Sequence, residues 1–212
     1  PCATVTDVGQ GLGEIVQRNE RNLEAARASI PLGAVGAWKG VKYEVVGLLR
    51  RAIEVDGERY EWSEYLLHHV EQGYAWISEY DGHFSFIRNA AEIPKPIGGF
   101  SLKPRVRYLG REFTHFQHAE ARVSHLAGEF YWRVKLGDTA TTDDYVAPPL
   151  ILSSEKTGNE ISWSLGEYAP GPEVWEAFGL KDKAPAPVGG LRARPAAPRP
   201  VAADPRRRTT DS

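Results

Sequence analysis

Three side chains in the middle of the chain have the chemistry of proton transfer or of cation binding: Glu64, His83 and Glu129. Glu64 stands between Trp62 and Leu66 in an alternating pattern, which predicts a partly buried carboxylate on one face of a strand. His83 follows a turn glycine, where an imidazole can serve as an acid, a base or a ligand. If the three converge in a cleft, they form an enzyme site or a small-ligand site. If each is satisfied by its own neighbours, they are structural residues, and the sequence favours this second interpretation because the motifs of a fold are more often packing than chemistry.

Tryptophans accompany these polar groups. Trp62, Trp76 and Trp132 could line a ligand pocket, although such residues more often form the core of a small β domain because each buries a large area. The predicted ligand-binding residues are therefore Glu64, His83, Glu129, Trp62, Trp76 and Trp132.

Complete catalytic motifs are missing from the sequence. It contains neither a Gly-x-Ser-x-Gly nucleophile elbow nor a glycine-rich phosphate loop. The single cysteine, Cys2, excludes an intrachain disulfide and leaves a zinc site short of ligands, because structural zinc needs four. His115 and His118 are predicted on opposite faces of a strand, from which they could not chelate one ion together. We therefore expect no catalytic residue, no cofactor and no metal, and the balance favours a protein that is not an enzyme.

Alternating apolar residues place the candidate side chains on strands. The runs 41–55, 58–67, 74–80 and 83–87 are rich in β-branched and aromatic residues. The pairs Asp56-Gly57 and Asp81-Gly82 separate two of these runs from the next, and such a pair favours the tight turn of a β-hairpin because glycine tolerates positive φ. The first half of the chain is thus predicted to be an antiparallel meander.

A second set of strand patterns follows a segment rich in proline and glycine. Strands are predicted at 105–116, 119–126 and 129–136, and 170–180 is predicted to be a short helix with Pro172 in its first turn. The predicted fold is all-β and mostly antiparallel, with two small barrel-like or sandwich-like units packed together and short peripheral helices. The expected divisions are a peripheral N-terminal segment (1–30), a first β unit (31–93), a linker (94–104), a second β unit with the short C-terminal helix (105–180) and a disordered Pro/Ala/Arg tail (181–212).

The charge distribution is uneven. The formal net charge is −2, but residues 184–212 hold six arginines against two aspartates, which leaves −6 on the rest of the chain. A mildly acidic body lacks the basic face of a nucleic-acid-binding fold, so no nucleic-acid partner is expected. No apolar run is long enough for a membrane span, and no signal peptide opens the sequence. The absence of methionine predicts a piece of a longer polypeptide, cytoplasmic or held at a membrane by parts outside this sequence.

Several motifs occur in the order found in a known family. They are WSEYLL at 62–67, GYAWISEYDGHF at 73–84, GEFYW at 128–132, a Pro-Pro-x-x-Leu-Ser-x-Glu pattern at 148–155 and a W-S-x-G-x-Y pattern at 163–168. Over about residues 32–180 the chain resembles an uncharacterised bacterial family of domains of unknown function, with the hallmarks W-x-E-Y-L-L, G-x-x-W-L-x-E-x-x-G-H-W and G-E-F-x-W. Ile77 and Phe84 stand where leucine and tryptophan are usual in that family.

The resemblance implies features that the residues alone do not show. Members often carry a zinc-ribbon-like segment before the domain, and Cys2 stands where its last ligand would fall. The resemblance also implies genomic proximity to polyamine aminopropyltransferase-like enzymes and to small membrane proteins of envelope-stress operons. No activity is settled for the family, so no catalytic residue is carried over.

The expected function is that of a non-catalytic binding or scaffolding module of a bacterial stress or membrane-associated system. The expected partner is an unidentified protein, for which membrane association is one of the alternatives. The alternative is an enzyme or a binder of a small, polyamine-like ligand, with a carboxylate and histidine cleft between the two β units. A deep pocket in which Glu64, His83 and Glu129 converge would favour the alternative. Scattered side chains, with an exposed aromatic patch or sheet edge, would favour the scaffold.

Overall fold

The computed structural model describes residues 27–55, 57–98 and 103–189. Within these ranges the chain forms eleven β-strands and one short helix. The strands are β1 (Val35–Trp38), β2 (Val41–Val55), β3 (Glu58–His69), β4 (Gly73–Tyr80), β5 (His83–Asn89), β6 (Lys95–Ile97), β7 (Arg105–Tyr108), β8 (Arg111–Gly128), β9 (Thr139–Ala147), β10 (Leu150–Thr157) and β11 (Glu160–Ala169), and the helix is α2 (Gly171–Ala177).

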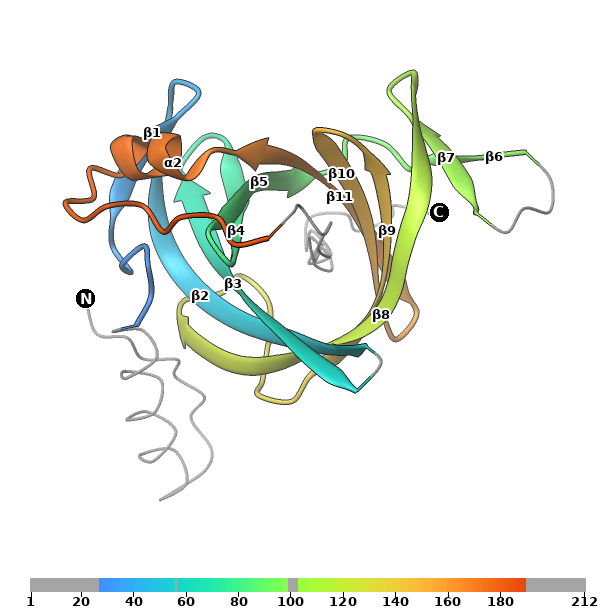
Figure 1. Ribbon diagram of the computed structural model, residues 1–212, viewed down its shortest axis with the longest axis horizontal. Coiled ribbons are helices and arrows are strands. Elements are labelled where there is room, and N and C mark those ends of the chain that lie inside the picture. Colours follow the sequence, from blue (N-terminus) through green and yellow to red (C-terminus); the bar gives the residue numbers. More distant parts are fainter. Residues whose placement is uncertain (1–26, 56, 99–102, 190–212) are drawn as a thin grey trace, which may run out of the picture.

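These strands form one antiparallel sheet that closes into a barrel (Figure 1). Neighbouring strands follow the order β1-β2-β3-β4-β5-β11-β10-β9-β8-β7-β6, and β2 pairs in addition with β8. That extra pairing sets Gly47–Ala52 against residues 122–128 and joins the ends of an eight-stranded ring made of β2–β5 and β8–β11. Strands β2 and β8 can pair on both edges and still extend beyond the ring because they are 15 and 18 residues long.

The all-β, antiparallel class is confirmed, but the arrangement in two packed units is not. Strands β2–β5 come from the first half of the chain and β8–β11 from the second, and both sets share one sheet. The pairings of β5 with β11 and of β2 with β8 leave neither half with an unpaired edge inside the ring. The residue boundaries given above for the separate units stay a prediction.

Tight turns at the hairpin tips follow from backbone preferences. Asp81 and Gly82 have φ angles of 44° and 75°, the pair of positive values that a two-residue primed turn requires, as the sequence predicts. Lys39 and Leu109, each followed by a glycine, have φ angles of 51° and 47° and form two further turns of this kind. Leu109 is the only aliphatic residue among these three. Positive φ is unfavourable for it because it has a β-carbon and its side chain cannot form a local hydrogen bond.

Helix α2 covers the outside of the barrel, as expected for its apolar residues (Figure 1). Val174, Trp175 and Phe178 are buried in the core cluster that also contains residues of β2, β3, β4 and β5. The Trp175 ring meets the Phe84 ring edge-on at 5.4 Å. Proline occupies the first turn, and Gly179 with a φ of 59° follows the helix, so both predicted boundary signals are confirmed.

One strand prediction in the second half is wrong, and two others have the wrong bounds. The segment 129–136 is an irregular connection, because Gly128 has a φ of 86° and turns the chain away from the β8 ladder. The predicted strands 105–116 and 119–126 are instead the short β7 followed, after the Leu109 turn, by the single long β8. The predicted N-terminal helix at 13–29 and most of the predicted tail at 181–212 lie outside the described residues.

Candidate functional site

A polar cluster lies inside the barrel. Arg51 of β2 donates a hydrogen bond from Nη1 to Oε2 of Glu155 on β10 at 2.8 Å. Because β2 and β10 are not neighbours in the sheet, this contact crosses the lumen. Glu64 of β3 places its Oε2 atom 4.0 Å from the same guanidinium nitrogen. All three side chains are buried, and Glu64 is only 1% exposed.

Neighbouring side chains fix the lumen carboxylates. Trp62 Nε1 donates to Glu64 Oε1 at 2.7 Å, two positions along the same strand face. Ser153 Oγ donates to Asp144 Oδ1 at 2.5 Å, across the β9–β10 pair. These bonds orient two of the acids without neutralising them, since each donor is uncharged.

The buried charges do not balance. Among the described residues, the buried charged side chains are one arginine, Arg51, and three carboxylates, Glu64, Asp144 and Glu155. Their formal sum is −2. Burial alone lowers the pKa of Arg51, but attraction to Glu155 and Glu64 outweighs the burial effect, so the pKa is raised overall. The guanidinium therefore stays protonated, and the lumen keeps an excess of acidic groups.

Apolar side chains flank the polar cluster on both sides. Along β3, Glu64 stands between Trp62 and Leu66 on the inward face. Leu66 belongs to an apolar cluster with Trp76, Ile87 and Ile151, and Trp62 belongs to another with Ile53, Ala119 and Ala121. The acids thus lie in a middle layer of the lumen, where low dielectric strengthens every charge interaction.

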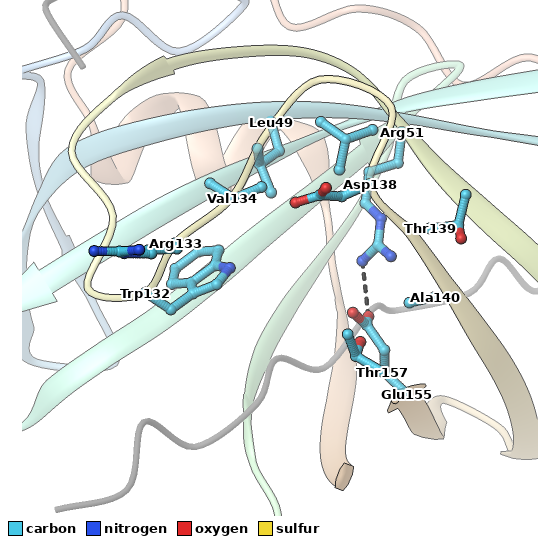
Figure 2. Close-up of a pocket in the computed structure, with 11 residues that line it drawn as sticks. Leu49, Arg51, Trp132, Arg133, Val134, Asp138, Thr139, Ala140, Glu155 and Thr157 are labelled. Atoms are coloured by element: carbon cyan, nitrogen blue, oxygen red, sulfur yellow. Dashed lines mark hydrogen bonds and ion pairs between the residues drawn. The ribbon is translucent and has the colours of Figure 1, made fainter. Parts of the chain in front are cut away.

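A pocket of about 230 Å³ reaches the Arg51–Glu155 pair (Figure 2). Its apolar lining consists of Leu49, Val123, Trp132, Val134 and Ala140, and its other polar lining of Arg133, Asp138, Thr139 and Thr157. The pocket therefore combines aliphatic walls with acidic and basic groups, a mixture suited to a small ligand that has both an apolar body and a charged end.

The connection between β8 and β9, residues 129–138, covers this pocket and supplies four of its lining residues (Figure 2). Backbone bonds hold the connection at both ends: Glu129 N donates to Val46 O at 2.8 Å, and Gly137 N donates to Val123 O at 2.8 Å. In between, the Trp132 ring lies edge-on to Trp76 at 5.6 Å. The covering loop is thus anchored by hydrogen bonds and by aromatic packing.

Four of the six predicted ligand-binding residues lie on the lumen side of the barrel. Trp62 and Glu64 are hydrogen-bonded to each other. Trp76 and Trp132 are in ring contact, and Trp132 also lines the pocket. The structure thus places Glu64 in the polar cluster of the lumen and Trp132 in the loop that covers the pocket.

The other two predicted residues do not join them. Both ring nitrogens of His83 are buried without a hydrogen-bond partner among the described residues, and its ring lies 6.3 Å from the Tyr168 ring. Glu129 is exposed. Glu64, His83 and Glu129 consequently do not converge within hydrogen-bonding reach of one another.

Sequence reasoning missed Arg51, Asp144 and Glu155. A signal was present for two of them: Arg51 interrupts the apolar run of β2, and Glu155 shares the period-two face of Ile151 and Ser153 on β10. A charged residue in a buried alternating pattern has to be paired, and opposite charges on two such strands predict a pair across the lumen. Knowledge of the closed ring is needed to bring the two strands together.

The prediction for His115 and His118 is wrong. His115 Nε2 lies 3.1 Å and His118 Nδ1 2.8 Å from the same Oδ1 atom of Asp143. The pairing of β8 with β9 shifts register between His115 and Gln117, and this bulge puts two side chains on one face that strict alternation would separate.

Residues 27–55, 57–98 and 103–189 contain neither a metal-ligand cluster nor a membrane-spanning helix. Within them, no group of three or more His, Cys, Asp or Glu side chains is arranged to hold a metal ion. No helix in the same ranges has the length and apolar character needed to cross a membrane.

Comparison with known proteins places the chain in a family. No curated protein and no solved structure matches it. Residues 31–171 match the family described as Domain of unknown function (DUF4178). The match spans more than half of the 212 residues and includes all eleven described strands. The chain therefore belongs to the DUF4178 family, whose description assigns no function.

Proposed function

We propose that this chain is a non-catalytic binding module whose barrel takes a small, positively charged ligand, an aliphatic amine of the polyamine type. The observation that carries the proposal is the excess of buried carboxylates in the lumen, three acids against Arg51 alone among the described buried side chains, of which Glu155 also lines the pocket. A bound ammonium group would offset this excess, since opposite charges attract strongly in a low-dielectric interior.

The lining of the pocket supports an amine on an aliphatic chain. Glu155 and Asp138 offer carboxylate oxygens, while Leu49, Val123 and Val134 offer surface for methylene groups. Each methylene that leaves water contributes about 0.8 kcal/mol. An ammonium group has three donors and no acceptor, which suits a site rich in acidic oxygens.

Buried hydroxyls near the acids support the same ligand. Ser162 Oγ and Ser164 Oγ are buried and have no hydrogen-bond partner among the described residues. Ser162 stands opposite Glu155 in the β10–β11 pair, and Ser164 stands opposite Ser153. Both hydroxyls have lone pairs that can accept from an ammonium group, and a buried polar group without a partner favours any ligand that satisfies it.

Binding is favoured over catalysis because the acids of the pocket and of the lumen are engaged in structural contacts. Glu155 is paired with Arg51, Glu64 accepts from Trp62, and Asp138 accepts from Lys135 N at 2.8 Å. The pocket thus presents charge rather than a nucleophile held beside a base. We also propose that the module binds a protein partner in a bacterial stress or membrane-associated system. This part of the proposal rests on the family resemblance alone.

Thermal unfolding with spermidine, putrescine and inorganic phosphate tests the proposal. A ligand at a hundred times its dissociation constant stabilises the folded state by about 2.7 kcal/mol. For a chain of this length that corresponds to a rise in Tm of roughly 5–10 °C. We expect spermidine or putrescine to raise Tm in this way and phosphate to leave it unchanged.

Two variants locate the binding. Glu155→Gln should remove most of the amine-induced rise, measured against that variant's own Tm because the substitution also disturbs the Arg51 pair. Glu173→Gln removes an exposed carboxylate on α2 and should retain the full rise. A Tm unaffected by every amine, a rise with phosphate only, or equal responses of the two variants would each overturn the proposal.

A further inference from the structure

The β6–β7 hairpin lies on the side of the barrel away from α2 (Figure 1). Two large aliphatic side chains next to its strands are exposed. Ile93 is 77% exposed and Leu109 is 66% exposed. Ile93 precedes β6 by two residues, and Leu109 directly follows β7. Because Lys95 stands opposite Arg107 in the β6–β7 pair, the two aliphatic residues lie at the same end of that pair.

Basic side chains surround these aliphatic residues. Lys95, Lys103, Arg105, Arg107 and Arg111 are all exposed. The acidic residues in the same stretch, 92–112, are Glu92 and Glu112, so the hairpin has a formal charge of +3 in a chain whose net charge is −2. Glu112 bonds to Arg107 at 2.8 Å and to Arg105 at 3.3 Å, but it neutralises only one of them.

The backbone at Leu109 is costly for leucine. Its φ of 47° lies in the left-handed region that favours glycine or asparagine. The two other described non-glycine residues with positive φ, Lys39 and Asp81, are polar residues at exposed tips. An exposed leucine in this conformation gains neither packing nor a local hydrogen bond, so folding alone does not account for it.

The underside of the hairpin holds this tip in place. Val106, Tyr108 and Phe113 are buried in one apolar cluster with Leu152 of β10. Tyr108 also accepts a hydrogen bond at its hydroxyl from Ala91 N at 2.8 Å, which fixes the chain just before Ile93. The exposed side of the hairpin is therefore a preformed surface on the barrel.

We propose that this hairpin docks the domain on an anionic lipid surface, with Ile93 and Leu109 inserted among the headgroups and acyl chains. Lys95, Arg105 and Arg107, which share one exposed face of the β6–β7 pair, lie against the lipid phosphates. A projecting aliphatic pair rimmed by basic residues matches both properties of such a surface, its apolar interior and its negative potential. A nucleic acid is less well matched, because no exposed side chain in the described part of the hairpin is aromatic and able to stack on a base. This proposal is independent of ligand binding in the lumen.

Co-sedimentation with vesicles tests the docking. We expect the chain to bind vesicles of phosphatidylcholine mixed with phosphatidylglycerol, to bind pure phosphatidylcholine weakly, and to dissociate as salt is raised. Arg107→Gln should weaken binding about fivefold, since each basic residue near an anionic membrane contributes roughly 1 kcal/mol. A duplex DNA of matched charge serves as the competing polyanion.

Leu109→Asn separates insertion from charge. Asparagine suits the positive φ, so the variant should keep its Tm while losing roughly tenfold in vesicle affinity. Val70→Asn removes an aliphatic side chain that is 86% exposed at another turn and should bind vesicles like the wild type. Absence of binding to anionic vesicles, equal affinity of Leu109→Asn and wild type, or tighter binding to DNA than to vesicles would overturn the proposal.

Discussion

Replacing Arg51 by methionine tests whether one guanidinium holds the acidic lumen together. Methionine keeps much of the length of the side chain and removes its charge. At 2.8 Å from Glu155 and 4.0 Å from Glu64, the guanidinium gains gross Coulomb energies of about 6 and about 4 kcal/mol at an effective dielectric constant of about 20. Desolvation offsets much of this gain.

The expected loss is the cost of orphaning the partners. Removing one member of a buried ion pair typically costs about 3–5 kcal/mol. Arg51→Met removes the cation that Glu64 and Glu155 share in the lumen, so we expect the upper end of that range. Glu155→Gln leaves Arg51 paired with Glu64 and should cost about 1–3 kcal/mol.

Urea unfolding followed by tryptophan fluorescence measures both single variants and the double variant. The double variant should be more stable than the sum of the two single losses predicts, with a coupling free energy of about 1–3 kcal/mol. An Arg51→Met loss below about 1 kcal/mol, or a coupling close to zero, would show that Arg51 does not compensate the lumen acids.

Two further predictions concern the outer core and the pocket rim. Burial and the neighbouring Glu79 carboxylate raise the pKa of Tyr65 in the folded protein, while an unfolded tyrosine ionises near pH 10. The stability that the neutral phenol contributes is therefore present below about pH 10 and is lost as the pH rises further. Tyr65→Phe should reduce this loss of stability at high pH, as measured by urea unfolding. Gly128→Ala should cost about 3 kcal/mol or more, because φ is 86° and the new Cβ would collide with the Val46 carbonyl oxygen. Gly110→Ala, with a φ of 77° and no atom near the new Cβ, should cost only about 1–2 kcal/mol, and equal losses at the two glycines would contradict the steric argument.

Local signals were sufficient for the hairpins and for helix α2. Asp81-Gly82 specifies its turn through two positive φ angles, and Pro172 with Gly179 marks the ends of the helix. These features depend on residues that are adjacent in sequence, so pattern reasoning reaches them. The same holds for Glu64, whose burial follows from its place between Trp62 and Leu66.

Long-range pairing was beyond local signals. Closure of the ring depends on β2 pairing with β8, whose residues are separated by most of the first β meander and the β6–β7 hairpin. Glu129 was named as a site residue and 129–136 was predicted to be a strand, but positive φ at Gly128 ends the ladder one residue earlier. The bulge after His115 likewise breaks the alternation on which the histidine prediction depended.

The contact between Arg51 and Glu155 joins two halves of the chain that contribute unequally to the buried charge. The half that is synthesised first contains the cation and one acid, Arg51 and Glu64, whereas Asp144 and Glu155 come later and have no buried cation of their own among the described residues. The later strands can bury their carboxylates cheaply only against a meander that is already formed. The distribution of buried charge therefore favours a folding order in which the N-terminal meander forms first and β9–β11 pack against it.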